Sequence, residues 1–210
     1  MVHAIAKRII PPIVKLWVKK INGIENMPED KNFIMAANHA SYLDHWIISS
    51  ILIPHTNKKL HYLAKKEHFD TFFQRIIHKW FGAIPFDRDT GGADALKWAL
   101  KALKEGKNIG IYPEGTRTLT GKMQRAKTGV ARLALGSKAP ILPIGLIGTF
   151  KIMPKGQHYP KLKRATVNIG KLMYFNEYYG KENDPETLRL VTTKIMKEIA
   201  KLSKQEYNFD

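Results

Sequence analysis

The chain has no cysteine. This absence excludes disulfide bonds, a cysteine nucleophile and any metal site built on thiolates. Because disulfides are typical of secreted proteins, a chain without cysteine is more typical of an intracellular protein.

Long apolar runs are also absent. The longest stretches without Asp, Glu, Lys or Arg are residues 45–57 and 139–150. Both are shorter than the roughly 18 apolar residues that predict a membrane-spanning helix. The sequence therefore predicts that no segment crosses the membrane.

Acidic residues are scarce. The chain has 18 Asp and Glu against 35 Lys and Arg, which gives a formal net charge of +17. The imbalance is greatest over residues 115–176, which contain twelve Lys or Arg and no Asp or Glu. A surface of this charge attracts polyanions, so nucleic acid, anionic lipid headgroups and an acidic carrier protein all remain open on charge alone.

The alternation of short apolar runs with helical patterns predicts the fold class. Length and a hydrophobic content of 44% suit one α/β domain with an added helix. We expect a mostly parallel or mixed sheet flanked by helices, with its site beyond the carboxyl ends of strands. The expected strands are residues 32–37, 60–64, 82–86, 108–112, 140–146 and 165–170, and the expected helices are residues 43–53, 68–79, 92–105, 126–137 and 185–205.

Residues 1–22 are predicted to form an amphipathic helix that precedes a single domain of residues 23–210. The first twenty residues hold five Lys or Arg and no acid, and their apolar residues recur at helical spacing. This pattern suits a helix at the surface of an anionic membrane, although an ordinary helix packed on its own domain has the same pattern. Pro11 and Pro12 should break or kink the helix. The interrupted apolar run argues against a signal peptide.

His39 and Asp44 stand in the stretch NHASYLD, directly after an expected strand. On a continuous helix these two side chains would point about 140° apart, so they can meet only across a turn between strand and helix. There Asp44 would fix the tautomer of His39 and leave the other ring nitrogen as a general base. The alternative is a structural histidine followed by an aspartate that caps the next helix.

No nucleophile on the protein is apparent, because none of the five serines lies in a G-x-S-x-G elbow. A substrate hydroxyl activated by His39 could attack a thioester directly, since a thiol with a pKa near 8.5 leaves easily. His45 would extend the pair to a metal-binding pattern, but the signal is weak and we predict no metal.

The stretch YPEGTRT, residues 112–118, offers a second site element at a strand end. Arg117 could hold a phosphate with two parallel hydrogen bonds, and Thr116 and Thr118 could add donors. The spacing of its glycines is similar to that of a phosphate-binding P-loop, but Thr116 stands where the lysine should be. A surface turn with a solvated arginine is the alternative. Arg88 and Lys65 are further candidate cations after expected strands.

Four blocks of sequence together resemble the glycerolipid acyltransferase family, whose bacterial member makes phosphatidic acid from lysophosphatidic acid. NHASYLD resembles its N-H-x4-D block, and GAIPFDR resembles its block that ends in arginine. YPEGTRT resembles its F-P-E-G-T-R-S block, and LPI resembles its apolar-proline-apolar block. The blocks lie in the family's order, in residues 38–44, 82–88, 112–118 and 142–144. Pro85 and Tyr112 depart conservatively from the usual choices.

The resemblance implies an acyltransferase domain in residues 23–210, with His39 as base and Asp44 as its orienting partner. It implies an acceptor site that includes Arg88, Arg117, Glu114, Gly115 and Thr116, to which Lys65 could contribute. It implies no cofactor, only an acyl-CoA or an acyl carrier protein as donor and a lysophospholipid as acceptor, most simply 1-acylglycerol 3-phosphate. Glycerol 3-phosphate or another lysolipid is an alternative acceptor, and a nucleic-acid-binding domain or a metal-dependent hydrolase is an alternative of another class.

The location that we expect is peripheral, at the cytoplasmic face of an anionic membrane. The chain lacks the long apolar N-terminal helices of many members of the family, so residues 1–20 are the expected attachment. We expect no nucleic acid as a partner.

Overall fold

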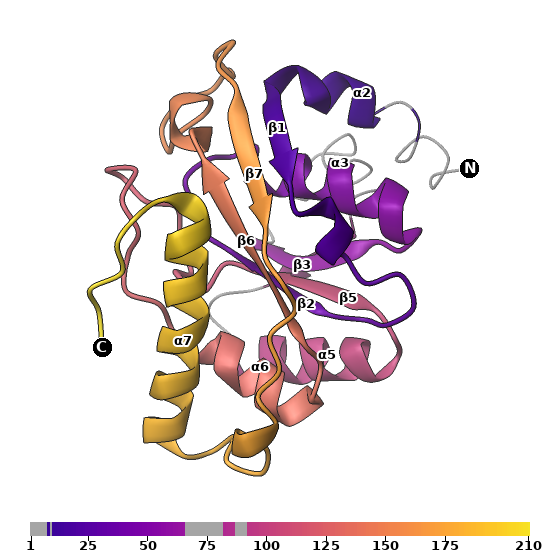
Figure 1. Ribbon diagram of the computed structural model, residues 1–210, viewed down its shortest axis with the longest axis vertical. Helices are drawn as coiled ribbons and strands as arrows, with labels where there is room; N and C mark the ends of the chain where they lie inside the picture. The colour runs from indigo at the N-terminus through magenta and orange to yellow at the C-terminus, as the bar shows by residue number, and fades with distance from the viewer. Residues whose placement is uncertain (1–7, 9, 66–81, 87–91) are drawn as a thin grey trace.

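The protein folds around one seven-stranded sheet that is covered by helices on both faces (Figure 1). The structure, a computed structural model, describes residues 8, 10–65, 82–86 and 92–210. The strands are β1 (Val18–Asn22), β2 (Ile34–Ala37), β3 (Leu60–Lys65), β4 (Ala83–Phe86), β5 (Asn108–Ile111), β6 (Ile141–Ile147) and β7 (Ala165–Ile169). The α-helices are α2 (Ile10–Val14), α3 (Asp44–Thr56), α5 (Gly92–Lys104), α6 (Gly129–Ser137) and α7 (Pro185–Ser203), and the short 3-10 helices are η1 (Lys15–Trp17), η2 (Ile24–Asn26), η4 (Thr149–Lys151) and η5 (Asn176–Tyr178).

The strands lie in the order β1-β7-β6-β2-β5-β3-β4. Every neighbouring pair is parallel except β6 and β7, which are antiparallel. The sheet is therefore mixed and mostly parallel, which confirms the predicted fold class. Strand β2 lies in the middle, between β5 and β6, and all four of its residues are buried. The segment that follows β2 consequently leaves from the centre of one edge of the sheet.

Side chains alternate along β2 between two hydrophobic cores. Ile34 and Ala36 face a core that they share with α5, α6 and α7. Met35 and Ala37 face the other core, which contains buried residues of α3 and Val14 of α2. This alternation follows from the two-residue period of a strand and gives three layers, with the sheet in the middle.

The predicted strands are confirmed, with ends shifted by one or two residues, and so are the predicted helices at α3, α5, α6 and α7. The largest shifts are of three residues: the first helix ends at Thr56 instead of residue 53, and the fourth begins at Gly129 instead of residue 126. The helix predicted for residues 68–79 lies outside the described residues.

The prediction of a helix over residues 1–22 is wrong at its end, because residues 18–22 form strand β1. Val18 and Ile21 of β1 pair in parallel with Ala165 and Val167 of β7. Five residues are too few for their apolar spacing to distinguish a helix from a strand. The local sequence also does not show that the backbone of β7 offers hydrogen-bond partners to these residues. Helix α2, as far as it is described, spans Ile10–Val14 and includes Pro11 and Pro12, and the 3-10 helix η1 follows it directly. Residues 1–7 and 9 of the predicted helix lie outside the described residues.

Among the described helices, none is both long and apolar enough to cross a membrane.

Candidate active site

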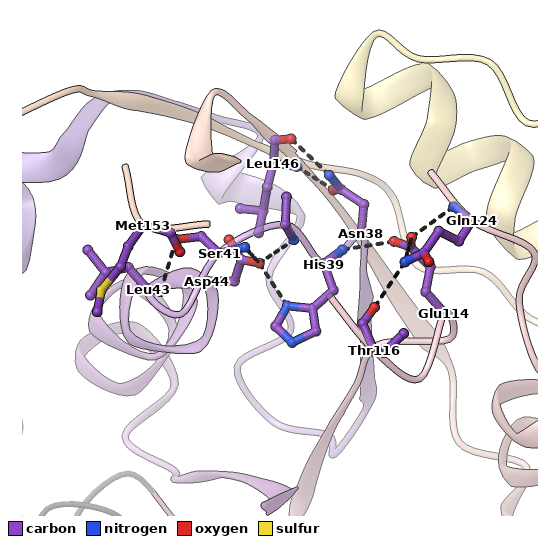
Figure 2. A network of polar contacts seen from close by, with 11 residues as sticks. Asn38, His39, Ser41, Leu43, Asp44, Glu114, Thr116, Gln124, Leu146 and Met153 are labelled. Carbon is purple, nitrogen blue, oxygen red and sulfur yellow. Dashed lines mark hydrogen bonds and ion pairs between the residues drawn. The ribbon is translucent and has the colours of Figure 1, made fainter. Parts of the chain in front are cut away.

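The turn between β2 and α3 brings His39 and Asp44 into contact. Asp44 is the first residue of α3 and is completely buried. Its Oδ2 lies 2.8 Å from Nδ1 of His39 and accepts from the backbone N–H groups of Ala40, at 2.7 Å, and Ser41, at 2.8 Å (Figure 2). One carboxylate oxygen therefore holds both the imidazole and the backbone of the turn. The contact predicted from the spacing is present.

These bonds set the orientation of the His39 ring. A carboxylate only accepts hydrogen bonds, so Nδ1 of His39 is the donor, and in the neutral imidazole Nε2 then carries the lone pair. The His39 side chain is 17% exposed, which leaves the ring accessible at one edge. An imidazole in this state can accept a proton from a hydroxyl group that approaches Nε2.

Tyr112, directly after β5, supports the flat face of the imidazole. The two rings are stacked, with their centroids 3.9 Å apart and their planes 14° from parallel. The Tyr112 hydroxyl is buried, and this burial raises the pKa of the phenol well above its ordinary value, so the ring next to His39 stays neutral. Sequence reasoning treated Tyr112 as a conservative replacement and missed this role. The only signal was an aromatic residue at a strand end, which does not name its partner.

Asn38 fixes the start of the same turn to β6. Its side-chain nitrogen donates to the Leu146 carbonyl at 3.0 Å, and its side-chain oxygen accepts from the Leu146 N–H at 2.8 Å (Figure 2). The amide thus continues the pairing of β2 with β6 beyond Ala37, the last paired residue. Of the common side chains, only an amide supplies both a donor and an acceptor in this geometry.

The middle of the turn is held by the segment that follows β6. The Met153 carbonyl accepts from the backbone N–H of Tyr42, at 2.9 Å, and from the Ser41 hydroxyl, at 3.0 Å. Ser41 is completely buried, and its oxygen also accepts from the N–H of Leu43. Four hydrogen bonds of Asn38, Ser41 and Tyr42 therefore hold the turn against β6 and the segment beyond it. The bonds to Asp44 join residues within the turn.

The second predicted element, the YPEGTRT turn, lies against the first. The Thr118 N–H donates to the His39 carbonyl at 2.9 Å, and the Gly115 N–H closes a tight turn on the Tyr112 carbonyl. Gly115 has a φ of 72°, in the left-handed region that other residues resist. Parallel strands β2 and β5 end at the same edge of the sheet, which is why two stretches more than 70 residues apart in sequence meet here.

Arg117 stacks on an aromatic ring of the first turn. Its guanidinium carbon lies 3.3 Å from the centroid of the Tyr42 ring. One guanidinium nitrogen, Nη1, is buried without a hydrogen-bond partner among the described residues. Stacking fixes the plane of the guanidinium, and a guanidinium with a fixed plane is suited to bind a phosphate with two parallel hydrogen bonds.

Glu114 lies behind His39 and is only 4% exposed. One carboxylate oxygen accepts from the His39 N–H at 2.9 Å, and the other accepts from the Gln124 N–H at 2.8 Å (Figure 2). Burial raises the pKa of this carboxyl group, and the hydrogen bonds from His39 and Gln124 oppose the shift. In these bonds Glu114 positions the backbone of His39. Its implied role in acceptor binding stays a prediction.

The remaining predicted residues fall in different places. Gly115 and Thr116 are exposed at the turn, and the Thr116 carbonyl accepts from the Gln124 side chain at 3.2 Å. Lys65 ends β3, but its side chain lies outside the described structure, and Arg88 lies outside the described residues. Among the described residues, no three His, Asp or Glu side chains gather as a metal site would require.

Comparisons with known proteins show the family to which the chain belongs. The family model described as Acyltransferase matches residues 19–147. The 1-acyl-sn-glycerol-3-phosphate acyltransferase of Bacillus subtilis is 34% identical over 129 residues, which cover 61% of this chain and 62% of the relative. The chloroplastic 1-acyl-sn-glycerol-3-phosphate acyltransferase LPAT1 of Arabidopsis thaliana is 31% identical over 69% of this chain and 42% of the relative. The matched part thus spans less than two thirds of either relative.

The 1-acyl-sn-glycerol-3-phosphate acyltransferase of Streptococcus pneumoniae is 26% identical over 92% of this chain and 70% of its own length. The crystal structure of the 1-acyl-sn-glycerophosphate (LPA) acyltransferase PlsC from Thermotoga maritima has a TM-score of 0.72 at 24% identity, over 99% of this chain and 80% of that chain. The likeness to this structure establishes the fold. Because the family model covers more than half of the chain and both turns of the site, the chain belongs to the acyltransferase family.

Proposed function

We propose that the protein transfers a fatty acyl group from a thioester to the free hydroxyl of a lysophospholipid. The observation that carries this proposal is the His39 imidazole, held by Asp44 on one nitrogen, next to a turn that presents the stacked guanidinium of Arg117. A base for a hydroxyl group and a cation for a phosphate are what acylation of a phosphorylated alcohol requires.

In the first step, Nε2 of His39 accepts the proton of the acceptor hydroxyl as the hydroxyl oxygen attacks the thioester carbonyl carbon. The Asp44 carboxylate stabilises the imidazolium that forms, across the 2.8 Å contact with Nδ1. The tetrahedral intermediate then collapses, the carbon–sulfur bond breaks, and the imidazolium returns the proton to the leaving thiolate. The products are an ester and a free thiol.

The acyl group passes directly between substrates in this proposal. Ser41 is the only serine in the two turns of the site, but its hydroxyl is buried and donates to the Met153 carbonyl. A serine in this state is not a nucleophile, and the sequence has no cysteine. This supports direct attack by the acceptor rather than an acyl-enzyme intermediate.

The acceptor that we propose is 1-acylglycerol 3-phosphate, which would give phosphatidic acid. Relatives at 34% and 31% identity carry this acceptor in their names. Arg117 would hold the phosphate, and Lys65 and Arg88 are proposed as additional cations. The donor is acyl-CoA or the acyl form of a carrier protein, and the enzyme acts peripherally on an anionic membrane surface at its cytoplasmic face, with no further cofactor.

The test is a panel of acyl-CoA and acyl carrier protein donors against 1-acylglycerol 3-phosphate, glycerol 3-phosphate and a lysophospholipid with a choline headgroup. Release of free thiol is measured for the wild type and for His39→Ala. We expect release that depends on 1-acylglycerol 3-phosphate and falls by roughly 10²-fold or more in His39→Ala. Thiol release that needs no acceptor, or that persists in His39→Ala, would contradict the proposal. A preference for glycerol 3-phosphate would revise the proposed acceptor but would leave the proposed mechanism unchanged.

A further inference from the structure

The most exposed large apolar side chains lie together in one loop. We name the segment between η4 and β7, residues 152–164, the β6–β7 loop. Among the described residues, its Leu162, at 86%, and Tyr159, at 82%, have the highest exposure of any large hydrophobic side chain. Such side chains cost free energy in water, so their presence on a protruding loop suggests a partner.

The β6–β7 loop is held in a defined shape. The Lys161 N–H donates to the Ile152 carbonyl at 2.9 Å, which closes the loop on itself. The Gln157 side chain donates to the carbonyls of Ile152 and Tyr159. Hydrogen bonds within the loop therefore fix the backbone that carries Tyr159 and Leu162.

The loop is joined to the N-terminal segment by two hydrogen bonds. The Trp17 indole N–H donates to the Lys161 carbonyl at 3.1 Å, and the Arg164 side chain donates to the Leu16 carbonyl, also at 3.1 Å. Leu16 and Ile13 of the N-terminal segment are more than half exposed. Both segments lie at the upper end of the molecule in Figure 1, around the starts of β1 and β7. The loop and residues 13–17 therefore form one surface.

The charged side chains of these two segments are all positive. Residues 13–17 and 152–164 contain five Lys or Arg and no Asp or Glu, and all five are exposed. Apolar tips that protrude, surrounded by cations, fit a deformable layer with anionic headgroups better than they fit the shaped surface of a folded protein. The charge and the protrusion together favour a lipid bilayer over an acidic carrier protein.

The surface is connected directly to the candidate active site. Met153, in the β6–β7 loop, accepts from Ser41 and Tyr42 of the turn between β2 and α3, and the Arg117 guanidinium stacks on the Tyr42 ring. The loop also leaves β6 at the edge of the sheet from which β2 delivers His39. A membrane bound at the loop would bring an acceptor lipid to this edge.

We infer that the β6–β7 loop is a second membrane-contacting element, which inserts Leu162 and Tyr159 into an anionic bilayer beside residues 13–17. The inference deepens the proposed function and rests on it only in the identity of the lipid that is delivered. Insertion itself can be measured without turnover.

Because the chain has no cysteine, Leu162→Cys provides a single site for an environment-sensitive fluorophore. The matched control is Leu190→Cys on α7, where the native leucine is 46% exposed. On vesicles with about one third phosphatidylglycerol, whose anionic headgroups attract Lys and Arg near the surface, we expect a blue shift and quenching by lipid-borne quenchers at residue 162 alone. No response at 162, or an equal response at 190, would overturn the inference. A response to acidic carrier protein but not to vesicles would replace the bilayer by a protein partner.

The double variant Tyr159→Ser/Leu162→Ser tests the consequence for function. We expect the affinity for vesicles to fall by about tenfold or more, because the inserted apolar surface is lost. The thermal unfolding transition should not change. The matched control Leu190→Ser should bind as the wild type does. Transfer should fall when the acceptor is in vesicles and remain at the wild-type level when the acceptor is in detergent micelles. If the wild type transfers no acyl group in either form, the proposed function fails, whereas the fluorescence result still decides the membrane contact. Unchanged vesicle binding by the double variant would overturn the inference.

Discussion

Replacing Asp44 by asparagine separates the charge of this side chain from its shape. Oδ2 accepts from the N–H groups of Ala40 and Ser41 as well as from His39. An asparagine must place its amide oxygen at this position, because its NH₂ group would otherwise face two backbone donors. His39 then keeps its tautomer, with Nε2 free, and loses only the negative charge beside it.

The expected loss of activity follows from Coulomb's law. For charge centres about 4 Å apart, at an effective dielectric constant of about 20, the attraction between a carboxylate and an imidazolium is about 4 kcal/mol. Since each 1.36 kcal/mol is a tenfold change in rate, Asp44→Asn should lower kcat by about 10³-fold. The acceptor KM should change little, because the charge acts on the imidazolium of the transition state rather than on bound substrate.

The expected loss of stability is smaller. Three hydrogen bonds to a charged acceptor become bonds to a neutral one, at a cost of about 1 kcal/mol each. The carboxylate is completely buried, and removing a buried charge offsets part of this cost. We therefore expect the free energy of unfolding to fall by about 3 kcal/mol or less, and the variant to remain folded.

The assay is steady-state thiol release with saturating donor, together with urea unfolding of the same preparations. Asp94→Asn is the matched control, since Asp94 is an exposed residue near the start of α5. It should leave kcat unchanged. A kcat of Asp44→Asn within about fivefold of wild type would refute the role of the carboxylate charge. A loss confined to KM would refute the assignment of that charge to the chemical step.

Three further predictions test other parts of the site. Arg117→Ala should lower kcat/KM for a phosphorylated acceptor by roughly 10- to 100-fold, as expected for a lost charge-assisted pair, and Arg117→Lys should recover only part of it, so wild-type kcat/KM in Arg117→Ala would rule out the phosphate contact. Asn38→Asp places a carboxylate oxygen against the Leu146 carbonyl and should lower the free energy of unfolding by about 3 kcal/mol in urea titrations, whereas an unchanged value would show that the amide is not needed. The raised pKa of Glu114 means that the native state holds this proton more tightly than the unfolded chain, so the stability it contributes is fully present below the ordinary value of 4.5 and is lost as pH rises through the raised pKa. Relative to Glu114→Gln, the wild type should therefore gain Tm as the pH falls from 7 toward 4.5, and the opposite slope would contradict the shift.

The sequence determined the fold class and the local chemistry of the site. Alternating strands and helices have periods that can be read along the chain, and the five-residue separation of His39 and Asp44 has a consistent meaning only across a strand-to-helix turn. The YPEGTRT turn could be placed for the same reason, because Gly115 and the end of a strand are local features. The family resemblance rests on these short blocks, and the family model confirms it over residues 19–147.

Only the tertiary structure decided which distant groups support that chemistry. Tyr112 stacks on His39, Tyr42 stacks on Arg117, and Met153 accepts from Ser41, and each pair joins residues at least 70 positions apart in sequence. The pairing of β1 with β7, which corrected the N-terminal prediction, spans still more of the chain. A local pattern indicates whether a side chain faces a core or solvent, but it does not indicate which distant residue the side chain contacts. That partner is set by the order of the strands in the sheet.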